Sequence, residues 1–313
     1  MEKDAIIFVA GGRGLVGSAI VRCLEAQGHT NILAPSRQEV DLSDEKSVDQ
    51  YFACHKPEYV FLAAAHVGGI GANSTYPVDF LLNNLKIQNA VISASYKHNV
   101  KKLLFLGSSC IYPKHCPQPM KEDMLLTGPL EPTNEAYAIA KIAGIKLCQA
   151  YKTQYGFNAI CAQPTNLYGP NDNFSNTQSH VLPALVRRIV EAKENNMGKI
   201  VCWGTGTPTR EFLYVDDLAE ACVFLMNNYD GKDIVNVGTG KEISIAGLVS
   251  EICKAVGWEG DIEWDSSKPD GTPRKVCDVS SLASMGWVAK TDLEQGIRQT
   301  VDWYLMNREN ARK

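Results

Sequence analysis

Tyr137 and Lys141 form a Tyr-x-x-x-Lys pair within a stretch whose pattern predicts a helix. Residues four apart share one helix face, so the ammonium of Lys141 can lie near the phenol of Tyr137 and favour its ionised form. A free phenol titrates near pH ~10, too high for acid or base chemistry at neutral pH, and a neighbouring cation corrects this. Ser108, upstream, is placed to hold a substrate oxygen. The pair alone is weak evidence, but together with Ser108 and a glycine-rich turn near the start of the chain it predicts a hydride-transfer site.

The glycine-rich turn follows the first apolar run, Ile6 to Ala10, and precedes a helical pattern from Leu15 to Leu24. Strand, glycine turn and helix in this order are typical of a dinucleotide site, where backbone approaches a pyrophosphate at the helix N-terminus. Two glycine registers fit, one beginning at Gly11 and one at Gly12, and both include Gly14 and Gly17. The residues expected to meet the cofactor here are Gly11, Gly12, Arg13, Gly14, Leu15, Val16 and Gly17.

Arginine, not an acidic residue, follows the second expected strand, Ile32 to Ala34. An Asp or Glu there would accept hydrogen bonds from the ribose 2′-hydroxyl of NAD. Arg37 and Arg13 could instead meet a 2′-phosphate bidentately, which favours NADP, although Glu39 and Asp41 weaken that preference. After the third expected strand, small side chains would leave room for the adenosine ribose and pyrophosphate; they are Ala63, Ala64 and Ala65.

Apolar runs of strand length alternate with helical patterns along the chain, which predicts repeated strand–helix units. The expected strands are Ile6 to Ala10, Ile32 to Ala34, Tyr59 to Ala63, Leu103 to Leu106, Ala159 to Ala162 and Ile234 to Val237. Such alternation favours an α/β fold, a Rossmann-type doubly wound parallel sheet covered on both faces.

From Gly169 onward turn residues interrupt shorter elements, as expected of a smaller domain with ligand-facing loops. We therefore expect an NADP-binding Rossmann domain over residues 1–165, with a returning segment at about 213–239. Residues 166–212 and 240–313 would form a smaller C-terminal α/β substrate-binding domain.

Composition excludes several classes of function. Lys and Arg number 31 against 35 Asp and Glu, a net charge of −4, which does not indicate a nucleic-acid partner. The apolar segment Ala5 to Ala10 is too short for a signal peptide or a membrane span, so we expect a cytoplasmic protein with no membrane partner. Ten cysteines stand singly without a C-x-x-C, which argues against zinc sites and a disulfide framework, and we expect no metal.

These residues together resemble the extended short-chain dehydrogenase/reductase family, and within it the GDP-4-keto-6-deoxy-D-mannose epimerase/reductases. The resemblance runs from the first strand to about Trp303. The glycine turn and the Tyr/Lys segment are shared widely in the family, whereas the last two of the following motifs are more selective. The motifs are Ala10 to Gly17, Ala63 to Gly69, Glu131 to Lys141, Pro164 to Pro170, Trp203 to Gly206, Arg210 to Phe212, Gly107 to Pro113 and Lys268 to Lys275.

The resemblance implies NADPH-dependent 3,5-epimerisation and 4-keto reduction of GDP-4-keto-6-deoxy-D-mannose to GDP-L-fucose. It assigns Cys110 as the base and His180 as the acid at carbons 3 and 5. Tyr137 and Ser108 would polarise the keto oxygen in both half-reactions. A cysteine two residues past the serine fits epimerisation, which needs a base and an acid on opposite faces of the sugar, whereas a simple reductase needs neither.

The resemblance also implies the remaining contacts. Substrate would meet Ser108, Arg188, Trp203, Arg210, Asp270 and Lys275, with the arginines on the diphosphate, Trp203 on a ring and Lys275 closing on the pyrophosphate. Cofactor would also meet Arg37, Asp41, Leu42, Leu106, Gly107, Lys141, Pro164, Asn166, Leu167 and His180. A homodimer is expected, with the helical stretches Leu85 to Tyr96 and Tyr137 to Tyr151 forming a four-helix interface.

Three alternatives remain open at this point. A related GDP-sugar enzyme, such as the GDP-colitose-forming type, would share the cofactor site but epimerise a single carbon. A dehydratase is disfavoured because Ser109 and Cys110 stand where that chemistry places an acidic pair. A non-catalytic NADP-sensing protein is disfavoured because Ser108, Tyr137 and Lys141 are all present.

Overall fold

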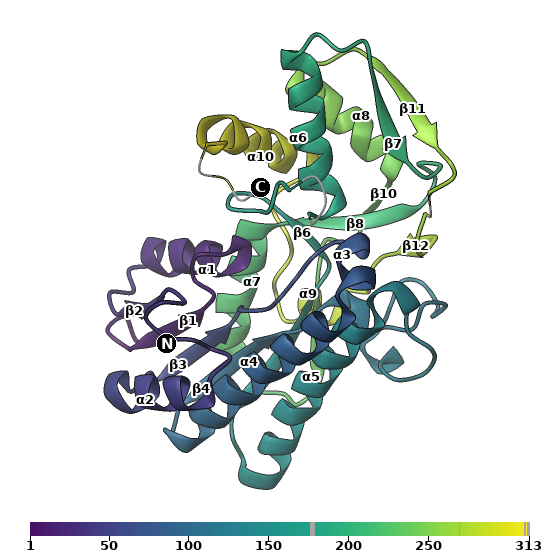
Figure 1. Cartoon of the computed structure of the whole chain (residues 1–313). Helices are drawn as coiled ribbons and strands as arrows, with labels where there is room; N and C mark the ends of the chain where they lie inside the picture. Colours follow the sequence, from purple (N-terminus) through teal and green to yellow (C-terminus); the bar gives the residue numbers. More distant parts are fainter. Residues whose placement is uncertain (176–178, 269, 310, 312–313) are drawn as a thin grey trace.

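A six-stranded parallel sheet forms the centre of the molecule (Figure 1). The computed structural model describes residues 1–175, 179–268, 270–309 and 311, so position 269, within the Lys268 to Lys275 motif, lies outside the described residues. The strand order is β2-β1-β3-β4-β5-β9, and every neighbouring pair is parallel. The strands are β1 (Ile7–Ala10), β2 (Ile32–Leu33), β3 (Tyr59–Leu62), β4 (Lys102–Leu106), β5 (Ala159–Pro164) and β9 (Ile234–Val237). All six expected apolar runs form strands of this sheet, which confirms the predicted Rossmann-type fold.

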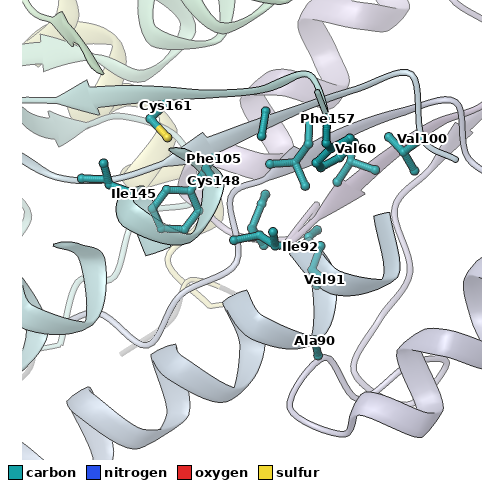
Figure 2. Packing of buried hydrophobic residues seen from close by; sticks show 14 of the residues in the cluster. Val60, Ala90, Val91, Ile92, Val100, Phe105, Ile145, Cys148, Phe157 and Cys161 are labelled. Carbon is teal, nitrogen blue, oxygen red and sulfur yellow. The ribbon is translucent and has the colours of Figure 1, made fainter. Parts of the chain in front are cut away.

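Helices cover both faces of the sheet because most strand residues are apolar and successive side chains point to opposite sides. In β1, Phe8 packs into one core cluster and Val9 into the other. The first cluster lies under α2 (Glu45–His55), α4 (Pro77–Lys97) and α5 (Glu135–Tyr155), and the second under α1 (Leu15–Ala26), α7 (Val215–Asn228) and α9 (Ser280–Ser284). Figure 2 shows part of the first cluster, with Phe105 of β4 among Val91 and Ile92 of α4 and Ile145 of α5.

A second group of elements lies above the carboxyl ends of the main strands in Figure 1. It contains a small sheet of β6 (Asn166–Tyr168), β8 (Thr209–Tyr214), β10 (Glu242–Ser244) and β12 (Arg274–Lys275), and a pair of parallel strands, β7 (Lys199–Trp203) and β11 (Asp261–Asp265). A third core cluster joins these strands to α6 (Val181–Glu194), α8 (Ile245–Val256) and α10 (Leu293–Asn307). The chain returns to the main sheet through α7 and β9, where the sequence predicts a returning segment. The domain boundaries themselves stay a prediction.

Short elements connect the two parts and shape the site between them. A short helix, α3 (Ile70–Thr75), precedes α4, and three single 3₁₀ turns, η1 (Ser109–Ile111), η2 (Glu122–Met124) and η3 (Pro132–Asn134), lie between β4 and α5. Local sequence sets several helix ends: Asp44 accepts a hydrogen bond from the Lys46 amide at the start of α2, and Gly156 ends α5 in the left-handed conformation. Within the described residues, none of these helices combines the length and the apolar character needed to cross a membrane.

Candidate active site

The glycine turn lies where the strand order reverses, because β2 and β3 flank β1 on opposite sides. In open α/β sheets this switch point is the usual place for a bound nucleotide. Gly11 has a φ of +80°, and a Cβ on it would lie 2.9 Å from the Cα of Ala64; a Cβ on Gly17 would lie 2.1 Å from the Gly11 carbonyl oxygen. A Cβ on Gly12 would lie 2.6 Å from the Cβ of Ala34, whereas one on Gly14 would only touch its surroundings at 3.4 Å. The tight turn therefore needs glycine at positions 11, 12 and 17.

The N-terminus of α1 fits a dinucleotide pyrophosphate. Gly14 is its N-cap residue and has no side chain to occupy the first-turn amides, and its own amide donates to Gly11 across the turn at 2.9 Å. These amides carry the positive end of the helix dipole. Leu15 and Val16, the next predicted contacts, are half-buried and pack on the second core cluster, as does Ala63 after β3. Ala64 and Ala65 are also half-buried.

Arg13 stands in the glycine turn after β1, and Arg37 stands in the loop after β2. Each forms a loose ion pair with an acidic residue of the loop after β2. Arg13 lies 3.6 Å from Glu39, and Arg37 lies 4.0 Å from Asp41. These ion pairs are exposed, so they contribute little stability and leave the guanidinium groups available to a phosphate. Asp41 accepts two bonds from Ser43, which with other contacts lower its pKa, and Leu42 packs against the first core cluster. Asp41 thus shapes the loop rather than presenting a free carboxylate.

Lys141 lies buried on α5, one turn after Tyr137. Its ammonium donates to the Leu106 carbonyl at 2.7 Å and lies 5.9 Å from the centre of the Tyr137 ring. Burial lowers the pKa of Lys141 to about 8. Burial also raises the pKa of Tyr137, the charge of Cys110 raises it further, and a hydrogen bond with Ser108 partly opposes both. In the free protein desolvation dominates and raises the pKa of Tyr137, so Tyr137 is a phenol that can donate, and the role of Lys141 in favouring its ionised form stays a prediction.

Ser108 lies two residues after β4 and caps η1. Its hydroxyl oxygen accepts from the Cys110 amide at 3.2 Å, while its own amide donates to Oε1 of Gln163 at 3.0 Å. Gln163 is fully buried in β5. A Cβ on residue 107 would lie only 1.8 Å from Oε1 of Gln163. Gly107 is thus required for this contact, and Gln163 orients the serine. Sequence reasoning missed Gln163; its only signal is a polar residue inside an otherwise apolar strand.

Cys110 receives two side-chain N–H groups from distant parts of the chain. Asn134 Nδ2 and Lys275 Nζ each lie 3.3 Å from its sulfur. Burial by itself raises the pKa of the Cys110 thiol, but the Lys275 charge and the bonds from Ser108, Lys275 and Asn134 outweigh it, so the pKa falls below its usual value. Asn134 was not among the predicted site residues, although it lies within the Glu131 to Lys141 motif.

His180 is the N-cap of α6, which belongs to the second group of elements. Part of the His180 residue is exposed to solvent, but the protein around it partly desolvates the ring. This desolvation lowers the pKa of His180, and the nearby charge of Lys275 lowers it further. The loop after β3 reaches this point: a Cβ on Gly69 would lie 2.6 Å from the Ser179 carbonyl oxygen. Lys275 therefore lies within electrostatic range of both predicted proton-transfer groups.

A second cluster, at the end of β7, on β8 and on the loops beside them, contains predicted substrate residues. Asp270 accepts from the Thr205 amide and from its hydroxyl, both at 2.8 Å, and Arg210 Nη2 donates to the Asp270 carbonyl at 3.4 Å. Trp203 keeps 65% of its surface exposed, and Lys268 Nζ lies 5.7 Å from its ring centre. We call Trp203, Thr205, Arg210, Lys268 and Asp270 the loop cluster. Thr205 and Lys268 were not predicted.

The other predicted residues lie at the edges of these two groups. Arg188 donates to the Val201 carbonyl at 2.8 Å, two residues before Trp203, whereas Arg187 turns to Glu191 and Phe174. Asn166 donates to the Glu211 carbonyl at 2.7 Å. Leu167 packs on the second core cluster, and Leu106 and Pro164 are buried at the ends of β4 and β5. Leu167 therefore supports the floor of the site through packing.

Comparison with known proteins identifies the class. The sequence model described as "NAD dependent epimerase/dehydratase family" matches residues 7–238, and the chain belongs to this family. The earlier resemblance to extended short-chain dehydrogenases is thereby confirmed.

Individual relatives narrow the class. The chain is 61% identical to "Putative GDP-L-fucose synthase 2" of Arabidopsis thaliana over 98% of this chain and 94% of that one. It is 50% identical to "GDP-L-fucose synthase" of Escherichia coli (strain K12), with all of both chains covered. "GDP-L-colitose synthase" of Yersinia pseudotuberculosis is more distant, at 39% identity over 97% of this chain and 99% of that one. Among solved structures, a GDP-L-fucose synthetase from Naegleria fowleri bound to NADP matches with a TM-score of 0.92 and 31% identity, covering 100% of this chain and 98% of that one.

Proposed function

We propose that the protein is an NADPH-dependent epimerase/reductase that converts GDP-4-keto-6-deoxy-D-mannose to GDP-L-fucose. The observation that carries the proposal is the site around Cys110. A thiol with a lowered pKa stands two residues after Ser108 and close to Tyr137, so a base for proton abstraction at carbon adjoins the groups that hold a keto oxygen. The kinship with curated GDP-L-fucose synthases supports the same reaction.

The residues divide the chemistry as follows. Tyr137 and Ser108 bind the keto oxygen and stabilise the enolate that forms when Cys110 removes a proton from the adjacent carbon. His180 returns a proton on the opposite face. Lys141 donates a hydrogen bond to the Leu106 carbonyl and supplies a buried positive charge beside Tyr137. When bound, NADPH supplies the hydride for the carbonyl carbon, and Tyr137 donates the proton that the resulting oxygen needs.

The binding groups fit a nucleotide sugar and a phosphorylated cofactor at two sides of this centre. Arg13 and Arg37 would take the 2′-phosphate, and the glycine turn would take the cofactor pyrophosphate. The loop cluster, with Arg188, would take the GDP portion, because Trp203 offers a ring face, Arg210 a charge and Asp270 a carboxylate.

Product analysis tests the proposal directly. The protein is incubated with NADPH and GDP-4-keto-6-deoxy-D-mannose, and the product is examined by NMR, with GDP-L-fucose expected. A product inverted at one carbon would assign the single-epimerisation reaction instead. Binding of NADPH without its consumption, across several GDP-keto sugars, would favour the sensor and overturn the enzyme.

We also propose that the protein is a homodimer. Exposed apolar side chains lie on α4 and α5, which pack side by side in Figure 1; they are Val78, Leu82, Tyr96, Ile139 and Tyr155. Two such helices from each copy could form a four-helix interface. Sedimentation at micromolar concentration is expected to give twice the 34.3 kDa chain mass. A single species at the chain mass, independent of concentration, would contradict this.

A cytoplasmic location completes the proposal. All ten cysteines lie in the described part of the chain, and each is a free thiol. Persistent free thiols suit a reducing compartment. Fractionation of the producing cell, with the protein expected beside soluble metabolic enzymes, would test the location.

A further inference from the structure

Two N–H donors converge on the sulfur of Cys110, and they come from different elements. Asn134 ends η3 and Lys275 ends β12, and each places its nitrogen 3.3 Å from Sγ. A neutral thiol is a weak acceptor and has its own proton to donate, so it gains little from two donors. A thiolate accepts both, and the ammonium adds a charge-assisted bond. The contact geometry is that expected of a thiolate binding site.

Both donors are tied to one carboxylate, Glu131. Its Oε2 lies 2.9 Å from Lys114 Nζ and accepts from Thr272 Oγ1 at 3.4 Å, three residues before Lys275. Its Oε1 accepts from the Thr133 amide, next to Asn134, at 3.4 Å. Lys275 is further held because β12 pairs with β8, placing it opposite Arg210. Glu131 therefore links the two chain segments that carry the donors, through Thr133 and Thr272.

Lys275 is the principal cation near Cys110, because the other nearby cations have partners of their own. Lys114 is paired with Glu131, and Arg274 with Glu242 at 2.8 Å. Arg210, on β8, acts on Cys110 at longer range but bonds to Thr209 and Asp270. Tyr137, on α5, is a neutral phenol. Among the residues that the structure describes, Lys275 has no carboxylate within ion-pair distance, and its hydrogen bond goes to the sulfur.

We infer that Lys275, assisted by Asn134, is a positioning residue that holds Cys110 as a thiolate ready to remove a proton from carbon. The inference deepens the proposed function and rests on it for the role of Cys110. Two carbons are epimerised in turn, so before the second abstraction the thiol must lose its proton to solvent and His180 must regain one from it. A small cavity of about 40 Å³ adjoins the sulfur and is lined by Asn134, Glu131 and Lys275, and it is large enough to hold a water molecule that could take that proton.

In each abstraction the thiolate takes the proton, and the C–H electron pair passes into the enolate whose oxygen Tyr137 and Ser108 hold. His180 then delivers a proton to the opposite face of the same carbon. The lowered pKa of Cys110, despite its burial, agrees with this arrangement. The sequence instead predicts that Lys275 closes on the substrate pyrophosphate. If that were its role, removing Lys275 would raise KM for the substrate but would leave the pKa of the Cys110 thiol unchanged.

Alkylation of Cys110 separates these roles without any sugar or NADPH. The protein is treated with iodoacetamide between pH 5.5 and 10, and carboxamidomethylation of Cys110 is followed by peptide mass spectrometry, with the exposed Cys54 as internal standard. We expect Lys275→Met to move the Cys110 profile to higher pH and to slow alkylation at pH 7 about tenfold, as a charge contact predicts. Lys275→Arg keeps the charge and is expected to restore most of the rate. Arg274→Ala, a neighbouring cation already paired with Glu242, is the matched control and is expected to match the wild type.

A second readout links the thiolate to proton transfer. Solvent deuterium uptake at carbons 3 and 5, measured without NADPH, is expected to fall about tenfold or more in Lys275→Met and to recover at higher pH. A wild-type Cys110 alkylation profile in folded Lys275→Met, with only KM raised, would overturn the inference and favour the pyrophosphate role. Absence of deuterium uptake in the wild type would instead overturn the proposed function, and the alkylation profile would still decide whether Lys275 holds a thiolate. Circular dichroism melts check that each variant folds.

Discussion

The catalytic pair Tyr137 and Lys141 lies in surroundings that differ from those of most of the binding groups. Lys141 is 3% exposed and Tyr137 is half-buried, and both stand on the long helix α5, packed against the main sheet. The loop cluster lies on short strands and the loops beside them; in it Trp203 is 65% exposed and Arg210 is half-buried. Arg13 and Arg37, at the cofactor side, have side chains that are 73% and 85% exposed.

This difference follows from what each group must do. Proton transfer depends on positions fixed to a fraction of an ångström and on shifted pKa values, both of which burial against rigid elements supplies. Binding a large, charged nucleotide needs side chains that can release water and weak ion pairs and then close on the ligand. Substitutions in the two regions should therefore change kcat and binding separately.

Tyr137→Phe should have the largest effect. Its oxygen supports the enolate and the reduced oxygen alike, so we expect both deuterium uptake and reduction to fall by ~10³-fold or more. NADPH affinity, measured by fluorescence, should stay near that of the wild type. Retention of deuterium uptake would show that Ser108 alone holds the keto oxygen.

Cys110→Ser should separate the two half-reactions. A hydroxyl is far less acidic than a thiol, so deuterium uptake at carbons 3 and 5 should fall by ~10²–10⁴-fold. Slow reduction of the unepimerised sugar should persist and yield a GDP-6-deoxyhexose of the wrong configuration, identifiable by NMR. Wild-type uptake in this variant would make Cys110 a packed thiol rather than a base.

Arg37→Ala should weaken NADPH by roughly ten- to a hundredfold, because losing a charge-assisted contact costs ~1.5–3 kcal/mol. NADH affinity should hardly change. Lys97→Ala, which removes an exposed cation paired with the distant Asp49, is the control. Equal weakening of both cofactors would contradict the 2′-phosphate contact.

The pH profile should report Lys141. Its pKa of about 8 means that the ammonium is present below that pH and is lost above it. We expect kcat/KM for direct reduction, measured in Cys110→Ser to remove the thiol titration, to fall about tenfold per pH unit above 8. Lys141→Met should be slower and should lack this decline. A rate that stays constant to pH 9.5 in the parent would argue against a charged Lys141 in the reaction.

Trp203→Ala should have the smallest effect. A ring contact at an exposed position contributes ~0.5–1 kcal/mol, so KM for the GDP sugar should rise by about two- to fivefold with kcat unchanged. Steady-state kinetics at saturating NADPH measure both. A fall in kcat instead would mean that the loop cluster helps to align the sugar with Tyr137.

Local patterns were sufficient to predict much of this protein. Helical spacing placed Lys141 on the face of Tyr137, and the strand–turn–helix pattern placed Gly11 and Gly17 in a tight turn, because these conformations depend on neighbouring residues. The six strands of the main sheet were predicted from short apolar runs for the same reason. The roles of the individual site residues remain predictions.

Contacts between distant segments could be decided only by the tertiary structure. Asn134 and Lys275 reach Cys110 from 24 and 165 residues away, and Gln163 reaches Ser108 from 55 residues away. No local pattern encodes these contacts, since they depend on where η3, β12 and β5 lie relative to the residues that follow β4. Electrostatics followed the same rule: spacing predicted that Lys141 lies near Tyr137, but the burial that raises the pKa of Tyr137 depends on the tertiary structure, because removing water penalises the phenolate.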